Sequence, residues 1–221
     1  NSFLKAAKKV LKTEADALEK LKDDLPVDFS DLVEFILNLT GRVIVSGVGK
    51  SGHIGNKIAA TLASTGTPAY FVHATEASHG DLGMITEQDL CLLISNSGET
   101  VEMFDILTHA RRFSIPIATM SSNCESTLVK AANFQLCLPM ADEACPIGMA
   151  PTTSTTMMLA LGDALAVALM EAKSFNAENF KIFHPGGKLG AKLMTVSQLM
   201  HKDDAIPLVK TELSMKETLL T

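Results

Sequence analysis

Five short apolar runs recur along the middle of the chain, and each is followed by a segment long enough for one helix. They span residues 43–45, 69–72, 90–94, 115–119 and 134–138. Continuous apolar runs of this length are typical of strands that are buried on both faces. Strands that alternate with helices form a parallel sheet. The sequence therefore predicts an α/β fold, a three-layer sandwich in which helices cover both faces of a five-stranded parallel sheet.

Helical periodicity is found on both sides of this pattern. Apolar residues three and four positions apart predict an amphipathic helix near residues 3–25 and a second helix over 29–39, begun by Asp28 or Ser30 and ended by Gly41. A long helix rich in Ala, Leu and Met is predicted over about residues 152–173. We expect N-terminal helices over residues 1–40, one domain over 41–193 and an appendage over 194–221.

Charge and cysteine usage exclude several classes of protein. The net charge is −6 and the basic residues are scattered, which argues against nucleic acid as a partner. Cys91, Cys124, Cys137 and Cys145 show no CxxC spacing, and no secretory signal precedes them. We therefore expect a reducing, cytoplasmic location. No apolar run reaches the roughly 18 residues of a membrane span, so no membrane partner is expected.

The loop after the first predicted strand is rich in glycine. A GxGxxG pattern is formed by Gly47, Gly49 and Gly52. A dinucleotide site also needs an acidic residue about 20 positions on, where residues 70–73 offer none, and a P-loop needs glycine where Ile44 stands. Exposed amides, the start of a helix and Lys50 still predict an anion site. The alternative is a turn needed only for packing a helix against a strand.

The stretch LCLLISNSGETVEM, residues 90–103, joins the third strand to a helix. Gly98 permits a tight exit from the strand, and hydroxyl groups beside free helix amides suit a phosphate; they belong to Ser95, Ser97 and Thr100. Glu102, one turn into the helix, is a candidate acid or base. The alternative is a simple N-cap by Ser97 or Thr100, with Glu99 and Glu102 balancing the helix dipole.

Other polar residues follow the second and fifth strands. His73 and His79 form a candidate metal pair, although zinc sites use three or four ligands, so substrate hydrogen bonding or helix capping is the alternative. Glu143 lies in a partly apolar stretch, where burial is expected to raise its pKa towards that of a base. Its alternative is a cap on the helix that follows. We read Cys145 as structural.

Several motifs in order resemble the sugar isomerase (SIS) family of phosphosugar-binding domains, and within it the arabinose 5-phosphate isomerases. They are GVGKSGHIG, SNSGET, EACPIGMAPTTSTT, GDALAVAL and HPGGKLG, and the resemblance covers residues 41–193. It implies a flavodoxin-like SIS sandwich. It also implies interconversion of D-ribulose 5-phosphate and D-arabinose 5-phosphate through a cis-enediol, which supplies the sugar Kdo for lipopolysaccharide or capsule. No cofactor is required.

The resemblance also implies roles for particular residues. The catalytic set is Lys50, Glu102, Glu143 and His184. Which carboxylate moves the proton stays open. The substrate-binding set is Ser46, Gly47, Gly49, Ser51, Gly66, Thr67, His73, His79, Ser95, Asn96, Ser97, Gly98 and Thr100. His73 is in addition a site for inhibitory zinc. The implied assembly is a homo-oligomer, tetramer or dimer, in which an adjacent subunit's His184 completes the active site.

The last residues, 194–221, resemble the opening strand, turn and helix of a cystathionine beta-synthase (CBS) module. Two other functions remain open from the sequence. One is a regulator of the same fold that senses a sugar phosphate, although the first 40 residues are too short and acidic for the DNA-binding helices expected of it. The other is an isomerase of a different ketose phosphate.

Overall fold

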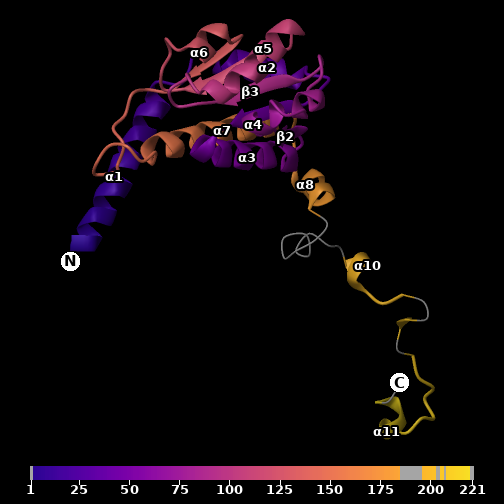
Figure 1. Cartoon of the computed structure of the whole chain (residues 1–221). Coiled ribbons are helices and arrows are strands. Elements are labelled where there is room, and N and C mark those ends of the chain that lie inside the picture. The colour runs from indigo at the N-terminus through magenta and orange to yellow at the C-terminus, as the bar shows by residue number, and fades with distance from the viewer. Residues whose placement is uncertain (1, 185–195, 203–204, 207, 220–221) are drawn as a thin grey trace. The chain divides into compact units, whose positions relative to one another are not determined.

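The computed structural model describes residues 2–184, 196–202, 205–206 and 208–219 (Figure 1). The chain divides into two compact units, Asn1–Phe180 and Lys181–Thr221. The first unit contains all the strands that the structure describes, and every predicted apolar run becomes one of them.

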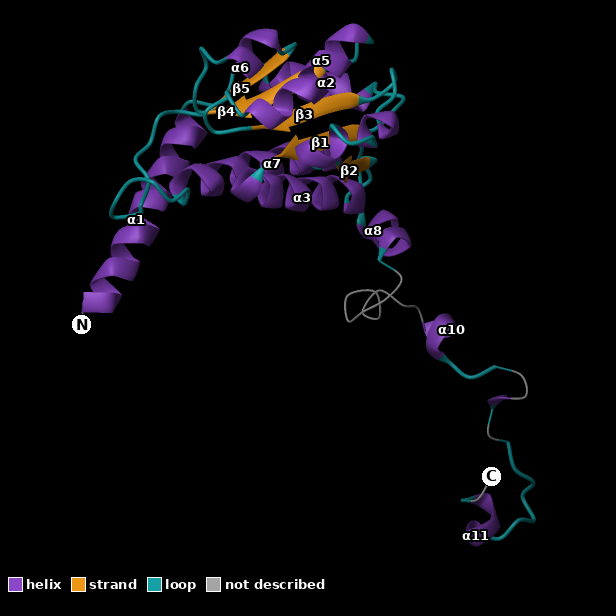
Figure 2. Ribbon diagram, viewed as in Figure 1, coloured by secondary structure: helices purple, strands orange, loops and turns teal. Residues whose placement is uncertain are grey.

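The strands of the first unit form one parallel sheet (Figure 2). They are β1 (Val43–Gly47), β2 (Ala69–Phe71), β3 (Leu90–Ile94), β4 (Ile117–Ser121) and β5 (Phe134–Cys137). Their order is β2-β1-β3-β4-β5, the flavodoxin-like order, and it confirms the predicted fold class. In this order the direction of winding reverses between β1 and β3, and ligands of such sheets bind at the carboxyl ends of the strands at that point.

Two layers of helices cover the sheet because alternate strand residues face opposite sides. On one face, Val43 and Val45 pack against α1 (Ser2–Asp23), α2 (Phe29–Leu37), α3 (Gly49–Ser64) and α7 (Thr153–Ala172). On the other face, Ile44 packs with α4 (Ala74–Ala77), α5 (Phe104–Arg112) and α6 (Thr127–Ala131). A 3₁₀ turn, η1 (Asp81–Met84), follows α4, and another, η2 (Val101–Met103), precedes α5.

The α2 helix starts where the sequence predicts, but not for the predicted reason. Asp28 is its N-cap residue, yet the Asp28 side chain caps no helix amide. Its carboxylate instead accepts a hydrogen bond from the backbone N–H of Gln135 on β5, at 2.7 Å. Asp28 therefore ties the helix to the edge of the sheet, a contact between residues far apart in the sequence.

The α7 helix is a long apolar helix in the core of the first unit. Within the described residues it alone is long and apolar enough to cross a membrane by length and composition, because 18 consecutive residues of it have a mean hydropathy of 1.4. Half of that stretch is buried inside the unit, where α7 packs on α3, α1 and α2. The sequence prediction concerned continuous apolar runs, and Gly162 and Asp163 divide the apolar residues of α7, so no such run in this helix reaches that length.

A buried ion pair joins the amino ends of β1 and β3. The Asp89 side chain is 0% exposed and accepts hydrogen bonds from the backbone N–H of Arg42, the Arg42 guanidinium and Thr86. The guanidinium also lies over the Tyr70 ring, 4.9 Å from its centroid. Burial alone would raise the pKa of Asp89, but the bonds from Arg42 and Thr86 outweigh it and lower that pKa.

We expect Asp89→Asn to lower the free energy of unfolding by about 1–3 kcal/mol at pH 7, because buried donors lose a charged acceptor. A lowered folded-state pKa stabilises the protein above the unfolded value of about 4 and loses that effect as pH falls through the folded value. The difference between wild type and variant should therefore shrink at pH 3. Urea unfolding at both pH values measures it.

The control is Asp163→Asn, which breaks a half-exposed pair with Lys57. Because solvent screens such a pair, its removal should change the free energy of unfolding by less than about 1 kcal/mol. A loss in Asp89→Asn that is equal at pH 7 and pH 3 would contradict the role of the Asp89 charge.

The second unit contains short helices. α8 (Ala177–Phe183) leads into it, and α10 (Val196–Leu199) and α11 (Met215–Thr218) follow. α11 begins with a capping box in which Ser214 and Glu217 bind each other's backbone N–H groups. Among the residues described beyond 195 there is no strand such as the CBS resemblance implies. Residues 185–190 of the HPGGKLG motif, which follow His184, lie outside the described residues, and the domain boundary at 193 stays a prediction.

Candidate functional site

The β1 loop, residues 46–51, turns directly from strand into helix. Gly49 has a φ of +59°, which favours glycine. A Cβ on Gly47 would lie 3.0 Å from the backbone of Ser51 and 3.1 Å from the carbonyl oxygen of Ile94, so the turn fits no larger residue without a shift. The first amides of α3 have no partner within the helix, and Lys50 is exposed beside them. The loop therefore presents N–H donors and a cation at the edge of the sheet.

Ser46, at the carboxyl end of β1, has a polar atom without a partner. The side chain is buried. Of all the buried side-chain oxygen and nitrogen atoms in the described residues, Ser46 Oγ alone makes no hydrogen bond. An unmade hydrogen bond at a buried hydroxyl costs about 1–3 kcal/mol. Such a group beneath the two strand-end loops is a candidate for a bond to a bound molecule.

The β3 loop, residues 95–100, is held by its own hydroxyl groups. The Ser95 and Thr100 hydroxyls hydrogen-bond each other at 2.8 Å, and Ser95 Oγ accepts from the N–H of Gly98 at 3.0 Å. Ser97 Oγ accepts from the N–H of Glu99 at 3.2 Å. Thr100 makes no side-chain cap to η2, and no such cap begins α5. The alternative that these hydroxyls simply cap the next helix is therefore not what the structure contains.

The β3 loop is also bound to the β4 loop, residues 122–126. Asn96 accepts from the hydroxyl groups of Ser121 and Ser122, and Asn123 donates to the carbonyl oxygen of Ser97 at 3.1 Å. The polar run SSNCES after the fourth apolar run was the available signal for this contact, and the sequence reasoning did not use it.

Glu99 has a role that the sequence did not predict. Its carboxylate accepts from the backbone N–H of Thr127, at 2.7 Å, and so caps α6 rather than the helix of its own loop. Gly98 has a φ of +65° and packs against Ser126, whose Oγ also caps α6. The β3 loop and the start of α6 therefore hold each other in place.

Glu143 caps the long helix α7. Its carboxylate accepts from the backbone N–H of Thr152 at 2.7 Å, from the Thr152 hydroxyl at 3.1 Å, and from the Ser154 hydroxyl. Burial alone would raise the pKa of Glu143, but the hydrogen bonds from Ser154 and Thr152 outweigh it and lower that pKa. The expectation of a raised pKa was wrong because it counted burial and not the donors at the helix start.

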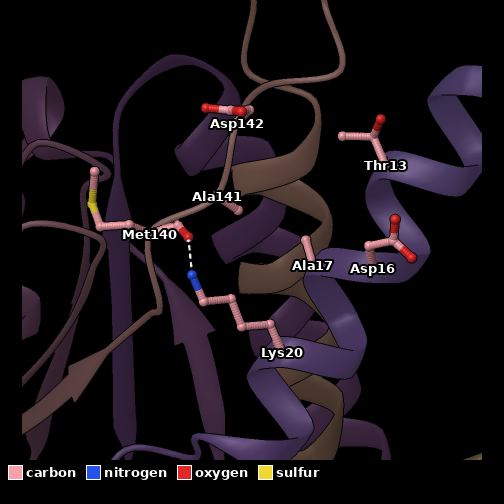
Figure 3. Close-up of a pocket in the computed structure, with 7 residues that line it drawn as sticks. All are labelled: Thr13, Asp16, Ala17, Lys20, Met140, Ala141 and Asp142. Atoms are coloured by element: carbon pink, nitrogen blue, oxygen red, sulfur yellow. Dashed lines mark hydrogen bonds between the residues drawn. The ribbon is translucent and has the colours of Figure 1, made fainter.

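A cavity of about 390 Å³ separates α1 from the segment that leads to Glu143 (Figure 3). Across it, Lys20 Nζ donates to the carbonyl oxygen of Met140 at 2.7 Å. No residue of the β1 or β3 loop lines this cavity. The cavity therefore lies beside the segment that leads to Glu143 and apart from both loops.

The structure brings the β1 and β3 loops together. β1 and β3 are neighbours, with Gly47 paired to Ile94, so both loops leave the same edge of the sheet side by side. Glu102 follows on η2 and is exposed. The loop before β2 is different: Thr67 lies at the amino ends of the strands, where it accepts from Lys173 Nζ at 2.7 Å, and Gly66 packs on Phe175. Within one chain, Gly66 and Thr67 therefore lie at the opposite ends of the strands from the two loops.

The histidines occupy separate positions. His73 follows β2, and its Nδ1 accepts from the N–H of Thr75 at 3.3 Å, which is the capping role foreseen as an alternative. His79 is exposed after α4. Within the described ranges no three His, Cys, Asp or Glu side chains gather as metal ligands would. His184 lies in the second unit, and its predicted role stays a prediction.

A parallel sheet in this order, with two adjacent loops that present amides, hydroxyls and a lysine, is typical of α/β domains that bind an anionic ligand at the carboxyl ends of the strands. Residues 36–168 match the family model described as the SIS domain, and the chain belongs to that family.

Relatives agree with this assignment. Arabinose 5-phosphate isomerase KdsD of Yersinia pestis is 53% identical over 219 residues, which cover 99% of this chain and 67% of that protein. KdsD of Escherichia coli K12 is 48% identical with the same coverage. Among solved structures, an E. coli CFT073 protein in complex with arabinose 5-phosphate has a TM-score of 0.81 and 39% identity, over 83% of this chain and 98% of that one.

Proposed function

We propose that this chain is an arabinose 5-phosphate isomerase, which interconverts D-ribulose 5-phosphate and D-arabinose 5-phosphate through a cis-enediol. The observation that carries the proposal is the pair of adjacent strand-end loops in a chain about half identical to enzymes of that name. The similar structure in complex with arabinose 5-phosphate supports the same substrate. Hydrogen moves between two carbons of one molecule, so the reaction consumes no redox cofactor.

The two loops are proposed to hold the phosphate. The free amides at the start of α3 and the Lys50 ammonium provide positive charge, and the β3 loop provides hydroxyl groups at Ser97 and Thr100. Ser46 Oγ, which is buried without a partner, is proposed to gain a hydrogen bond when substrate binds. The other predicted contacts, to Gly66, Thr67, His73 and His79, stay predictions.

The contacts of the two glutamates separate their proposed roles. Glu143 is ionised and held by donors from Thr152 and Ser154, so a proton on it would cost those bonds. Glu102 is exposed and accepts no hydrogen bond from the part of the chain that the structure describes. We therefore assign proton transfer between the two carbons to Glu102. We assign to Glu143 the role of holding the first residues of α7, and their hydroxyl groups, in position.

The remaining parts of the proposal concern assembly and place. A homo-oligomer in which the adjacent subunit's His184 completes the site, and opens the sugar ring, follows from the family resemblance. A cytoplasmic location fits the free state of Cys91, Cys124, Cys137 and Cys145. Supply of Kdo for lipopolysaccharide or capsule is the proposed outcome of the reaction. Zinc at His73 is proposed as an inhibitor and not as a cofactor.

A substrate comparison tests this function. Purified protein should convert ribulose 5-phosphate to arabinose 5-phosphate, with kcat/KM at least about 100-fold above that for fructose 6-phosphate or sedoheptulose 7-phosphate, because added carbons must fit pocket walls shaped for five. Aldose formation measured by chromatography gives the ratio. Preference for a longer ketose would identify a different isomerase. Tight binding of a sugar phosphate without any turnover would favour the sensing regulator.

A further inference from the structure

Two cysteines meet where β4 and β5 end. Cys137 is the last residue of β5 and is paired with Ser121, the last residue of β4. Cys124 lies three positions beyond Ser121, in the turn that the Ser126 N–H closes on the carbonyl oxygen of Asn123 at 3.2 Å. Both cysteines line one surface cavity of about 360 Å³. The fold therefore places two free thiols on the wall of the same cavity.

The two thiols differ in access. Cys124 is exposed and Cys137 is half-buried. Burial first, and then the influence of the neighbouring Cys124 thiol, raises the pKa of Cys137 to about 12, so this thiol does not ionise readily by itself. An oxidant from solution therefore meets Cys124 first, with Cys137 next to it as a second thiol. That arrangement is typical of cysteine pairs that respond to redox conditions.

We propose that Cys124 and Cys137 form a reversible disulfide that controls the position of the β3 loop. The oxidant is a small disulfide of the glutathione type. The Cys124 thiolate attacks one of its sulfurs, breaks the sulfur–sulfur bond, forms a mixed disulfide and releases one thiolate, which takes a proton from water. The Cys137 thiol then gives its proton to water and attacks Cys124 Sγ, which breaks the mixed disulfide and releases the second thiolate, to be protonated in turn. Two protein thiols are oxidised and one small disulfide is reduced to two thiols.

The turn that carries Cys124 also holds the β3 loop. Its neighbour Asn123 donates to the carbonyl oxygen of Ser97 at 3.1 Å, and Ser122 donates to Asn96 Oδ1 at 2.8 Å. The two sulfurs must approach to about 2 Å when they bond. Because Cys137 is fixed in the sheet, most of this movement falls on the Cys124 turn. A displacement of about 1 Å in groups that position a substrate reduces turnover about 100-fold.

The experiment compares reduced protein with protein oxidised by glutathione disulfide. Intact mass and peptide mapping detect the Cys124–Cys137 link, and hydrogen exchange of residues 95–100 reports on the β3 loop. Turnover of ribulose 5-phosphate is measured in parallel. We expect the link to form, exchange in the β3 loop to change, turnover to fall by about tenfold or more, and dithiothreitol to reverse all three.

Variants separate this pair from the other cysteines. Cys124→Ser and Cys137→Ser should each lose the response to oxidation, whereas Cys145→Ser, the matched control, should keep it. Oxidation that links other cysteines, or a link that leaves exchange in residues 95–100 unchanged, would overturn the proposal. The effect on turnover rests on the proposed isomerase activity, but the link and the exchange do not, so failure of one can be told from failure of the other.

Discussion

Glu102→Gln is expected to reduce kcat about 100-fold or more with little change in the stability of the fold. General acid–base catalysis by a placed side chain contributes about 10²–10⁴-fold, and glutamine keeps the shape of Glu102 without its basicity. Glu102 is exposed on η2, so the core does not depend on it. Initial rates with ribulose 5-phosphate, and exchange of the substrate's α-hydrogen with deuterium from solvent, measure the loss.

Two other glutamates serve as matched controls. Glu99→Gln changes the same loop, but Glu99 caps α6, so the variant should lower the melting temperature and keep most of the turnover. Glu143→Gln removes the charge that caps α7 and should lower the free energy of unfolding by about 1 kcal/mol. If the Glu102→Gln variant still exchanges the substrate's α-hydrogen with deuterium from solvent, and the Glu143→Gln variant does not, the assignment of the base to Glu102 is wrong.

Gly98→Ala is expected to damage both the site and the fold. The added Cβ would lie 1.9 Å from Ser126 Oγ and 2.4 Å from Ser126 Cβ, and the backbone φ of +65° is strained for alanine. Ser126 is buried at the start of α6 and cannot swing away. We expect a loss of about 1–3 kcal/mol in the free energy of unfolding and about 100-fold in kcat/KM. Denaturant unfolding and steady-state kinetics measure the two effects.

Clash and backbone strain can be separated at two other positions. Gly148 has nearly the same φ, +67°, but no atom within 4 Å of a Cβ, so Gly148→Ala should show the strain alone. Adding Ser126→Gly to Gly98→Ala removes the two nearest atoms that the new Cβ meets, leaves Ser121 Oγ at 3.2 Å, and should recover part of the lost kcat/KM. No recovery would show that the clash with Ser126 is not the cause.

The order of apolar runs was sufficient to predict the sheet. Short, mostly apolar runs that alternate with helix-length segments are typical of a parallel sheet covered on both faces, and β3 has the predicted bounds of 90–94. The other strand ends moved by up to two residues, as with β4, which runs from Ile117 to Ser121 rather than over 115–119. The sequence also predicted the two loops, with their amides, hydroxyls and Lys50, because a loop between a strand and a helix has a local signature.

The tertiary structure decided which residues from other elements contact the residues of the candidate site. Glu99 caps α6, Asn96 binds the β4 loop, and Glu143 gathers donors that lower its pKa, and each contact joins residues from different elements. Spacing along the chain predicts only neighbours within one element, because periodicity reports the face of a helix or strand and not what meets it. The sequence by itself thus determined the sheet and its glycine-rich ends, and the packed fold alone determined how each carboxylate is held.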